Sequence, residues 1–285
     1  MICAFVLQQY NRKDLSDLHS DHLLRGTMKK LFLGQYRYFE FVPSETLINY
    51  TVIFIINENT MQTILMLKYG KKYSAADVNR IVNDTGRKYT YVCFTDDPTG
   101  LDPIVVAWPL PDDIEGHWYK VWMFSQRGFG DVLYLDLDVR IQKNIDHLWN
   151  YLDIHPTIAY TYWKNKEFPD YVGETHGMRY LSNYNSSVMM WKDGTTQHIW
   201  EHFENNSDYY MVKYFGDDRF LWHEDFRFNY FPKGEIYSFV YGADYYGIDD
   251  HNESFWYRPS YTIALLNGLD QFPGADKEYD ELRMH

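Results

Sequence analysis

The chain has 285 residues, of which 45% are hydrophobic and 19% aromatic, so it can bury a sizeable core and is not an intrinsically disordered chain. Its formal net charge of −13 repels nucleic acid and anionic membranes, which argues against nucleic-acid partners. No apolar run reaches the roughly 18 residues of a membrane span, no signal-peptide pattern opens the chain, and the two cysteines define no disulfide framework. We therefore expect a soluble, cytoplasmic protein.

Residues 1–60 differ in composition from the rest of the chain. Mixed charges over residues 12–30 precede an aromatic stretch at residues 36–41 and a strand-like stretch at residues 51–56. No chemical motif occurs there. We predict an N-terminal extension of unknown role.

From residue 61 onward, strand and helix patterns alternate. Short apolar runs predict strands at residues 63–67, 89–95, 104–108 and 132–135. Ser74 and Asp77 form a capping-box pattern at the start of one helix, and a second helix is predicted over residues 117–124. This alternation predicts an α/β, Rossmann-like fold with a mixed, mostly parallel sheet flanked by helices, in which ligands bind at the carboxyl ends of strands.

The strand at residues 132–135 leads directly into two carboxylates, Asp136 and Asp138. Residues two apart at a strand end share one face, so the two carboxylates repel each other and lose hydration unless a cation lies between them. All-oxygen ligation suits Mg²⁺ or Mn²⁺. The alternative is an exposed strand end that carries two acidic residues by chance.

Later elements follow a less regular order. We predict a short helix over residues 144–151, strands at 157–163 and 187–191, a helix over 197–204, and strands at 237–241 and 261–266. The last fifteen residues, 271–285, are polar and are predicted to be a C-terminal tail.

Four segments together resemble the GT-A nucleotide-sugar glycosyltransferases, and in particular the glycogenin-like and bacterial galactosyltransferase-like group with its phage and bacterial relatives. These segments are Leu67-Lys68-Tyr69-Gly70, Cys93-Phe94-Thr95-Asp96-Asp97, Leu133-Tyr134-Leu135-Asp136-Leu137-Asp138 and Asn144-Ile145-Asp146. The likeness covers residues 61–270. It implies transfer of a hexose, with retention, from a nucleotide-diphosphate sugar (UDP as the expected nucleotide) to a saccharide, lipid or protein acceptor that the sequence does not identify.

The resemblance also implies a set of site residues. The implied donor-binding residues are Leu67, Lys68, Tyr69, Asp96, Asp97, Lys120, Asp136, Leu137 and Ser186. The residues implied at the transferred sugar are Asn185, Asp217 and Asp218, and the ligands implied for Mn²⁺ or Mg²⁺ are Asp136, Asp138 and Asn267. Two positions depart from the family pattern: Ser187 replaces a glycine, and Asn267 replaces a histidine that serves as the third metal ligand.

Three other classes remain as alternatives. The chain could bind a nucleotide sugar without turnover, or Asp136 and Asp138 could be the nucleophile pair of a haloacid-dehalogenase-like phosphatase with Asp217 and Asp218 as its later acidic motif. Residues 198–202 match the H-x-x-E-H pattern of zinc proteases. We interpret that stretch as a surface helix.

Overall fold

The computed structural model describes residues 61–161, 182–214, 216–244, 247–248 and 255–284, together with three strands before residue 61. Contacts divide the chain into two compact units, Met1–Met61 and Gln62–His285. The first unit holds an antiparallel sheet in the order β1-β2-β3. Its strands are β1 (Gly26–Leu33), β2 (Tyr36–Pro43) and β3 (Ile53–Asn57). That this segment is an N-terminal extension of the main domain stays a prediction.

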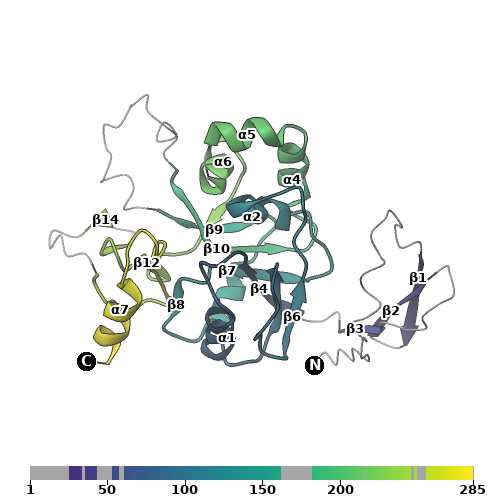
Figure 1. The fold of residues 1–285 in the computed structure, drawn as a ribbon, viewed down its shortest axis with the longest axis horizontal. Helices are drawn as coiled ribbons and strands as arrows, with labels where there is room; N and C mark the ends of the chain where they lie inside the picture. The colour runs from purple at the N-terminus through teal and green to yellow at the C-terminus, as the bar shows by residue number, and fades with distance from the viewer. Residues whose placement is uncertain are drawn as a thin grey trace. The chain divides into compact units, whose positions relative to one another are not determined.

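A seven-stranded sheet of order β11-β9-β10-β7-β4-β5-β6 forms the centre of the second unit (Figure 1). Its strands are β4 (Gln62–Lys68), β5 (Thr90–Thr95), β6 (Val105–Trp108), β7 (Asp131–Leu135), β9 (Thr157–Tyr160), β10 (Tyr184–Lys192) and β11 (Asn229–Tyr230). The pairs β7·β4, β4·β5, β5·β6 and β11·β9 are parallel, and β10 runs antiparallel to both β7 and β9. The predicted mixed, mostly parallel sheet is confirmed. Residues 162 and 163 of the strand predicted at 157–163 lie outside the described residues.

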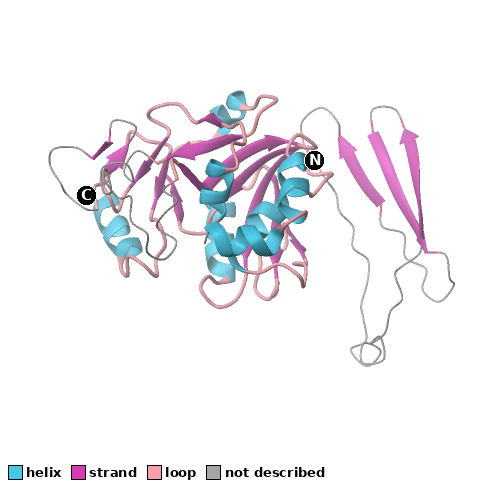
Figure 2. Cartoon of the chain, turned by 90° about the horizontal axis from the view of Figure 1, so that it is seen from above, coloured by secondary structure: helices cyan, strands magenta, loops and turns pink. Residues whose placement is uncertain are grey.

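The central strands are apolar on both faces because both faces are covered. Ile64 and Leu133 belong to a core cluster that includes helix α1, whereas Leu65 and Val132 belong to a second cluster that includes α2, α4, α5 and α6. Figure 1 shows α4, α5 and α6 gathered on one side of the sheet and α1 on the other, and Figure 2 shows the same elements from above. The helices are α1 (Ala75–Asp84), α2 (Tyr119–Met123), α4 (Gln197–Glu204), α5 (Ser207–Tyr214) and α6 (Asp217–His223).

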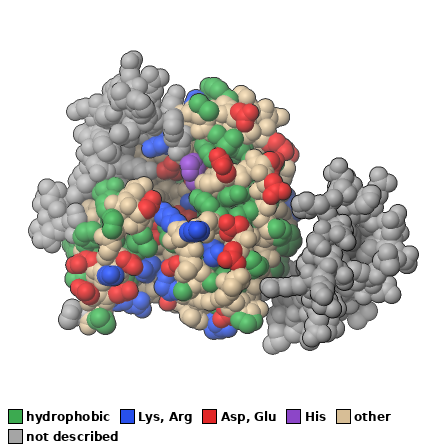
Figure 3. Space-filling model, viewed as in Figure 1, with side chains coloured by type: hydrophobic (Ala, Val, Ile, Leu, Met, Phe, Trp, Pro, Cys, Tyr) green, Lys and Arg blue, Asp and Glu red, His purple; other side chains and the backbone are tan. Residues whose placement is uncertain are grey.

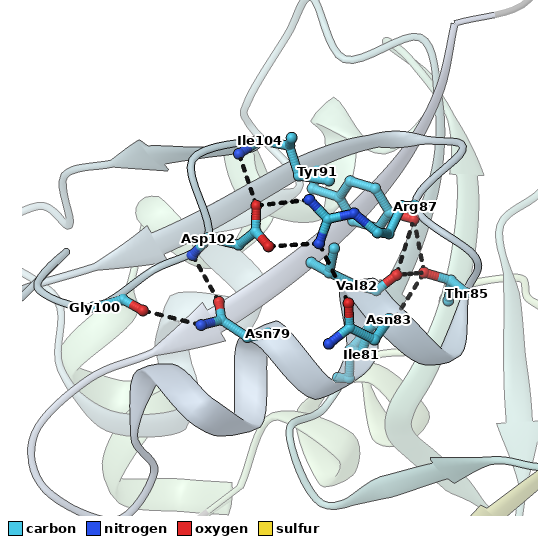
Figure 4. A network of polar contacts seen from close by, with 10 residues as sticks. All are labelled: Asn79, Ile81, Val82, Asn83, Thr85, Arg87, Tyr91, Gly100, Asp102 and Ile104. Atoms are coloured by element: carbon cyan, nitrogen blue, oxygen red, sulfur yellow. Dashed lines mark hydrogen bonds and ion pairs between the residues drawn. The ribbon is translucent and has the colours of Figure 1, made fainter.

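Helix α1 begins and ends with defined polar contacts. The predicted capping box is present, with Ser74 and Asp77 bonding each other's backbone amides. At the other end Arg87 pairs with Asp102 through both terminal nitrogens, at 2.5 and 3.1 Å (Figure 4). Asn79 donates to the Gly100 carbonyl at 2.9 Å in the same network. These contacts tie α1 to the segment that follows β5.

Two predicted helices are shorter or tighter than expected. Residues 116–123 form a 3₁₀ turn, η1 (Gly116–Trp118), followed by the single α-helical turn of α2. The helix predicted over residues 144–151 is a 3₁₀ helix, η2 (Asp146–Tyr151). A 3₁₀ geometry is common in such short connecting pieces.

Asp136, Leu137 and Asp138, here called the D-x-D segment, lead into a five-stranded sheet of order β14-β13-β12-β15-β8. Its strands are β8 (Val139–Ile141), β12 (Ile236–Ser238), β13 (Ala243–Asp244), β14 (Gly247–Ile248) and β15 (Ile263–Leu265). A third core cluster joins this sheet to α7 (Ala275–Arg283).

The prediction that residues 271–285 form a polar tail is therefore wrong. Ala275 and Tyr279 are both fully buried, and the Tyr279 hydroxyl donates to Gln142 Oε1 at 2.9 Å. These two residues are four apart and share one helical face, so a mostly polar helix still buries an apolar stripe.

The surface of the second unit carries both signs of charge. Figure 3 shows acidic and basic side chains interspersed on the face that it presents. Within the part of the chain that the structure describes, we find no helix with the length and apolar character needed to cross a membrane.

Candidate active site

The two D-x-D carboxylates lie in a turn between two sheets rather than at the end of one strand, as the sequence had led us to expect. Asp136 follows β7 and Asp138 precedes β8. The Asp136 amide donates to the Ser187 carbonyl at 2.8 Å, which extends the antiparallel β7·β10 pairing by one step. Both carboxylates nevertheless line the same cavity.

This cavity has a volume of about 510 Å³ and opens at the carboxyl ends of β4 and β7, where α/β sheets bind ligands. Its lining comes from six separate stretches of the chain. The lining residues are Leu67, Tyr69, Lys72, Tyr73, His117, Lys120, Tyr134, Asp136, Leu137, Asp138, Asn185, Ser187, Tyr241, Asn267, Gly268, Asp270 and Gln271.

Lys120 is the buried cation of this cavity. Its ammonium lies 2.8 Å from Asp136 Oδ2 and donates to Ser186 Oγ at 3.2 Å, and the Tyr134 hydroxyl donates to the other Asp136 oxygen. Burial alone would lower the pKa of Lys120, but the carboxylates of Asp136, Asp217 and Asp138 together hold that pKa above its ordinary value. The ammonium therefore stays charged at neutral pH.

Asp138 is only 5% exposed and accepts two hydrogen bonds on Oδ2, from the Tyr73 hydroxyl at 3.0 Å and from the Gly268 amide at 2.8 Å. Burial raises the pKa of the Asp138 carboxyl, and the neighbouring Asp136 carboxylate raises it further. A buried carboxylate beside a second one is stabilised by an added positive charge.

Asn267 lies in the turn that reaches Asp138. Asn267 (φ 54°) and Gly268 (φ 87°) both adopt the left-handed conformation that asparagine and glycine tolerate best. Asn267 lines the cavity, and its amide oxygen accepts a hydrogen bond from the Ser238 hydroxyl at 2.6 Å. The turn thus brings the third predicted metal ligand next to the D-x-D segment.

The donor set of Asp136, Asp138 and Asn267 fits a hard divalent cation. A carboxylate has about four acceptor sites and an amide oxygen two, so the hydrogen bonds described above leave lone pairs available. Among the described residues no three His, Cys, Asp or Glu side chains converge as a metal site. A Mn²⁺ or Mg²⁺ ion held by these residues would have two carboxylates and one amide as protein ligands, with the remaining positions left to water or substrate.

The residues predicted at the transferred sugar lie on β10 and α6, and Asp217 and Asp218 are not among the residues that line the cavity. Asn185 lines the cavity, and its side-chain oxygen accepts the Ser187 amide at 3.0 Å where the β9·β10 register shifts. Asp217 is 5% exposed, and none of the described residues supplies a hydrogen-bond partner for its Oδ2. Burial raises the pKa of Asp217, and Lys120 counteracts that shift. Asp218 Oδ1 accepts the Arg219 amide at 2.8 Å.

The predicted nucleotide-binding residues divide into two groups. Leu67 and Tyr69 line the cavity, but Lys68, Asp96 and Asp97 do not. The Lys68 ammonium donates to the Asp97 carbonyl at 2.9 Å, and Asp96 Oδ2 accepts the Gly70 amide at 2.8 Å. These contacts join the loops after β4 and β5 and so shape the rim of the site.

Several lining residues were not predicted from the sequence. Tyr134 stands two positions before Asp136 on a strand, and His117 stands one helical turn before Lys120, so periodicity could have found both. Tyr73, Tyr241 and Gln271 approach through tertiary packing. No local pattern marks them.

The H-x-x-E-H stretch lies on α4 and forms a surface helix, as predicted. His198 and Glu201 are exposed. His202 Nε2 bonds Glu224 Oε2 at 2.8 Å, and His198 packs against the Phe226 ring at 5.9 Å. Both histidines thus contact the Phe226 ring, His202 at 5.4 Å, and among the described residues no His, Cys, Asp and Glu side chains gather around them as a metal site.

Neither the protein-family models nor the curated proteins yield a match to this sequence. Among solved structures, the chain is similar to galactosyltransferase LgtC in complex with donor and acceptor sugar analogues, with a TM-score of 0.48 and 13% identity over 76% of this chain and 94% of that one. It is similar to mouse xyloside xylosyltransferase 1, with a TM-score of 0.46 and 14% identity over 72% and 97% of the two chains. It is also similar to the glycosyltransferase GlyE of Streptococcus pneumoniae, with a TM-score of 0.42 and 14% identity over 60% and 45%. All three are glycosyltransferases, the class of enzyme that the sequence motifs resemble.

Proposed function

We propose that the chain is a metal-dependent glycosyltransferase that moves a hexose from a nucleotide-diphosphate sugar, with UDP as the expected nucleotide, to a saccharide, lipid or protein acceptor. One observation carries the proposal: Asp136 and Asp138 line a cavity of about 510 Å³ together with the buried ammonium of Lys120. Such a combination of carboxylates and a fixed cation suits a diphosphate better than it suits a neutral ligand.

The chemistry follows from the charges. Cleavage of a sugar–diphosphate bond leaves negative charge on the departing phosphate, and a bound Mn²⁺ or Mg²⁺ supplies Lewis-acid stabilisation of that charge. Lys120 offers a preorganised ammonium in the same cavity, held in place by Asp136 and Ser186. Asp217, Asp218 and Asn185 are proposed to orient the transferred sugar. Retention at the anomeric carbon is proposed from the family resemblance.

Calorimetry with UDP, GDP, ADP and CDP, each with and without Mn²⁺, tests the proposal. We expect one nucleotide, UDP, to bind in a Mn²⁺-dependent manner, and Asp138→Ala to weaken that binding at least about tenfold, the scale on which metal-shell changes act. Asp113→Ala, at an exposed position outside the cavity lining, is the matched control. If Asp138→Ala binds UDP and Mn²⁺ as tightly as the unmutated chain, the metal-bridged site is wrong.

The second candidate is a module that binds a nucleotide sugar without turnover. The replacement of the family's histidine by Asn267 favours it, because an amide oxygen is a weaker ligand than imidazole for first-row divalent ions. NMR spectroscopy of the UDP-sugar, followed over hours with Mn²⁺, separates the two functions. Release of UDP with a sugar product of unchanged anomeric configuration supports the transferase and retention together, whereas an intact donor that remains bound supports the module.

A further inference from the structure

His117 presents an unpartnered polar atom at the proposed sugar end of the cavity. The residue lines the cavity, yet its Nε2 is buried and has no hydrogen-bond partner among the residues that the structure describes. A buried ring nitrogen without a partner costs free energy, because its hydration is lost without compensation. A ligand that supplies a hydrogen-bond partner for Nε2 therefore recovers this free energy on binding.

The ring is held by the core. It lies 5.1 Å from the Trp118 ring, which is 5% exposed and stacks on Phe203 at 5.2 Å. His117 and Lys120 are three positions apart on continuous helical turns, so both side chains leave the same side of that segment. The ring nitrogen is thus fixed relative to the ammonium.

A second unpartnered atom belongs to the same neighbourhood. Asp217 Oδ2 is buried without a hydrogen-bond partner in the described part of the chain, and both Lys120 and His117 are among the groups whose charges act on the Asp217 carboxyl. Lys120, which bonds Asp136, thus lies within electrostatic range of Asp217, and so does His117. If the diphosphate lies at Asp136, the sugar attached to it extends toward the two unpartnered atoms.

We propose that His117 is a specificity-determining residue, whose Nε2 hydrogen-bonds a hydroxyl group of the transferred sugar beside the unpartnered oxygen of Asp217. A sugar hydroxyl is both a donor and an acceptor, so one hydroxyl can accept from the imidazole N–H and donate to the carboxylate. The donor class is then a sugar with a free hydroxyl at this point. A deoxy sugar is rejected because it leaves both protein atoms unpaired. This inference rests on the proposed function.

The test compares binding of UDP with binding of UDP-glucose, UDP-galactose and their deoxy analogues, each lacking one hydroxyl, in the presence of Mn²⁺. The unmutated chain is expected to bind one deoxy analogue about tenfold more weakly than the parent sugar, the effect of one lost hydrogen bond that leaves protein groups unpaired. His117→Phe keeps a ring but no nitrogen, and should lose this discrimination while its affinity for UDP alone stays within twofold.

His117→Gln and His117→Asn are the matched pair, because a Gln amide reaches the Nε2 position and an Asn amide does not. Discrimination should survive in the Gln variant and vanish in the Asn variant, which also serves as the test if His117→Phe fails to fold. If the Phe or Asn variant keeps the discrimination, or if the unmutated chain shows none, this inference alone is overturned. If the unmutated chain binds neither UDP nor any UDP-sugar with Mn²⁺, the proposed function falls and the inference falls with it.

Discussion

The guanidinium of Arg80, on α1, donates a hydrogen bond at 2.6 Å to the carbonyl oxygen of Leu137, the residue between the two cavity aspartates. A second hydrogen bond, at 2.9 Å, reaches the Val139 carbonyl. Helix α1 thus stabilises the turn that carries Asp136 and Asp138, although no residue of this helix is among the residues that line the cavity. Arg80 is a positioning residue for the site.

We expect Arg80→Met to weaken Mn²⁺-dependent UDP binding about tenfold, because two backbone carbonyls lose a charged donor and the turn relaxes. The measurement is calorimetric titration with UDP at saturating Mn²⁺. Arg87→Met, three residues beyond the C-terminal end of α1, removes the ion pair of an exposed arginine with Asp102 and should leave UDP affinity unchanged. Equal affinities in the two variants would contradict the positioning role.

Asn267→His restores the ligand that the family resemblance implies. Histidine tolerates the left-handed backbone of this position, and imidazole suits first-row divalent ions, so Mn²⁺ affinity should rise on the order of tenfold. Titration monitored by Mn²⁺ paramagnetic relaxation measures the change. Ser238→Ala, which removes the hydroxyl that bonds Asn267 and adds no ligand, is the control. An unchanged Mn²⁺ affinity in Asn267→His would show that residue 267 does not reach the ion.

Glu224, which directly follows α6 and bonds side chains of α4 and α5, makes the stability of the fold depend on pH. Burial alone would raise the pKa of the Glu224 carboxyl, but hydrogen bonds from Tyr214, His202 and Lys213 together set it below its ordinary value. A lowered folded-state pKa means that the unfolded chain binds more protons as the pH falls. The contribution to stability is therefore complete above the unfolded pKa and is lost as the pH falls through the folded one.

Glu224→Gln should accordingly lower the free energy of unfolding by about 1.5 kcal/mol at pH 7, the lower end of the range for a hydrogen bond to a charged group. The difference from the unmutated chain should fade below the ordinary glutamate pKa. Urea unfolding across the pH range measures both. Glu204→Gln, an exposed substitution on α4, is the control and should show no such trend. A difference that grows as the pH falls would contradict the assignment.

Tyr279 tests whether α7 belongs to the fold. Tyr279→Ala should cost about 3–5 kcal/mol, the range for removal of a large buried aromatic side chain. Tyr279→Phe should cost about 1 kcal/mol, because it removes only the hydrogen bond to Gln142. Lys277→Ala, at an exposed position on the same helix, should be neutral. Equal stability of Tyr279→Ala and Lys277→Ala in thermal unfolding would mean that α7 is dispensable.

Local patterns in the sequence were enough to predict six strands of the central sheet (β4, β5, β6, β7, β9 and β10), the Ser74 cap and the surface helix of α4, because buried strands and helix caps have recognisable residue patterns. The short strands β8, β11, β13 and β14 were not predicted. The patterns failed for α7, whose buried face consists of few apolar residues among many charges. They also placed Asp136 and Asp138 on one strand, because the pattern does not show that β8 joins another sheet. Whether a side chain such as Tyr73 reaches the cavity depends on tertiary packing, which no short window contains.

The division of β7 and β8 between two sheets has a mechanical consequence. Asp136 follows a strand of the seven-stranded sheet, and Asp138 precedes a strand of the five-stranded one. Any sliding of one sheet against the other therefore changes the separation of the two carboxylates. An ion bound by both carboxylates would cross-link the two sheets. Its binding and release would therefore alter the position of the five-stranded sheet and of α7, which packs against that sheet.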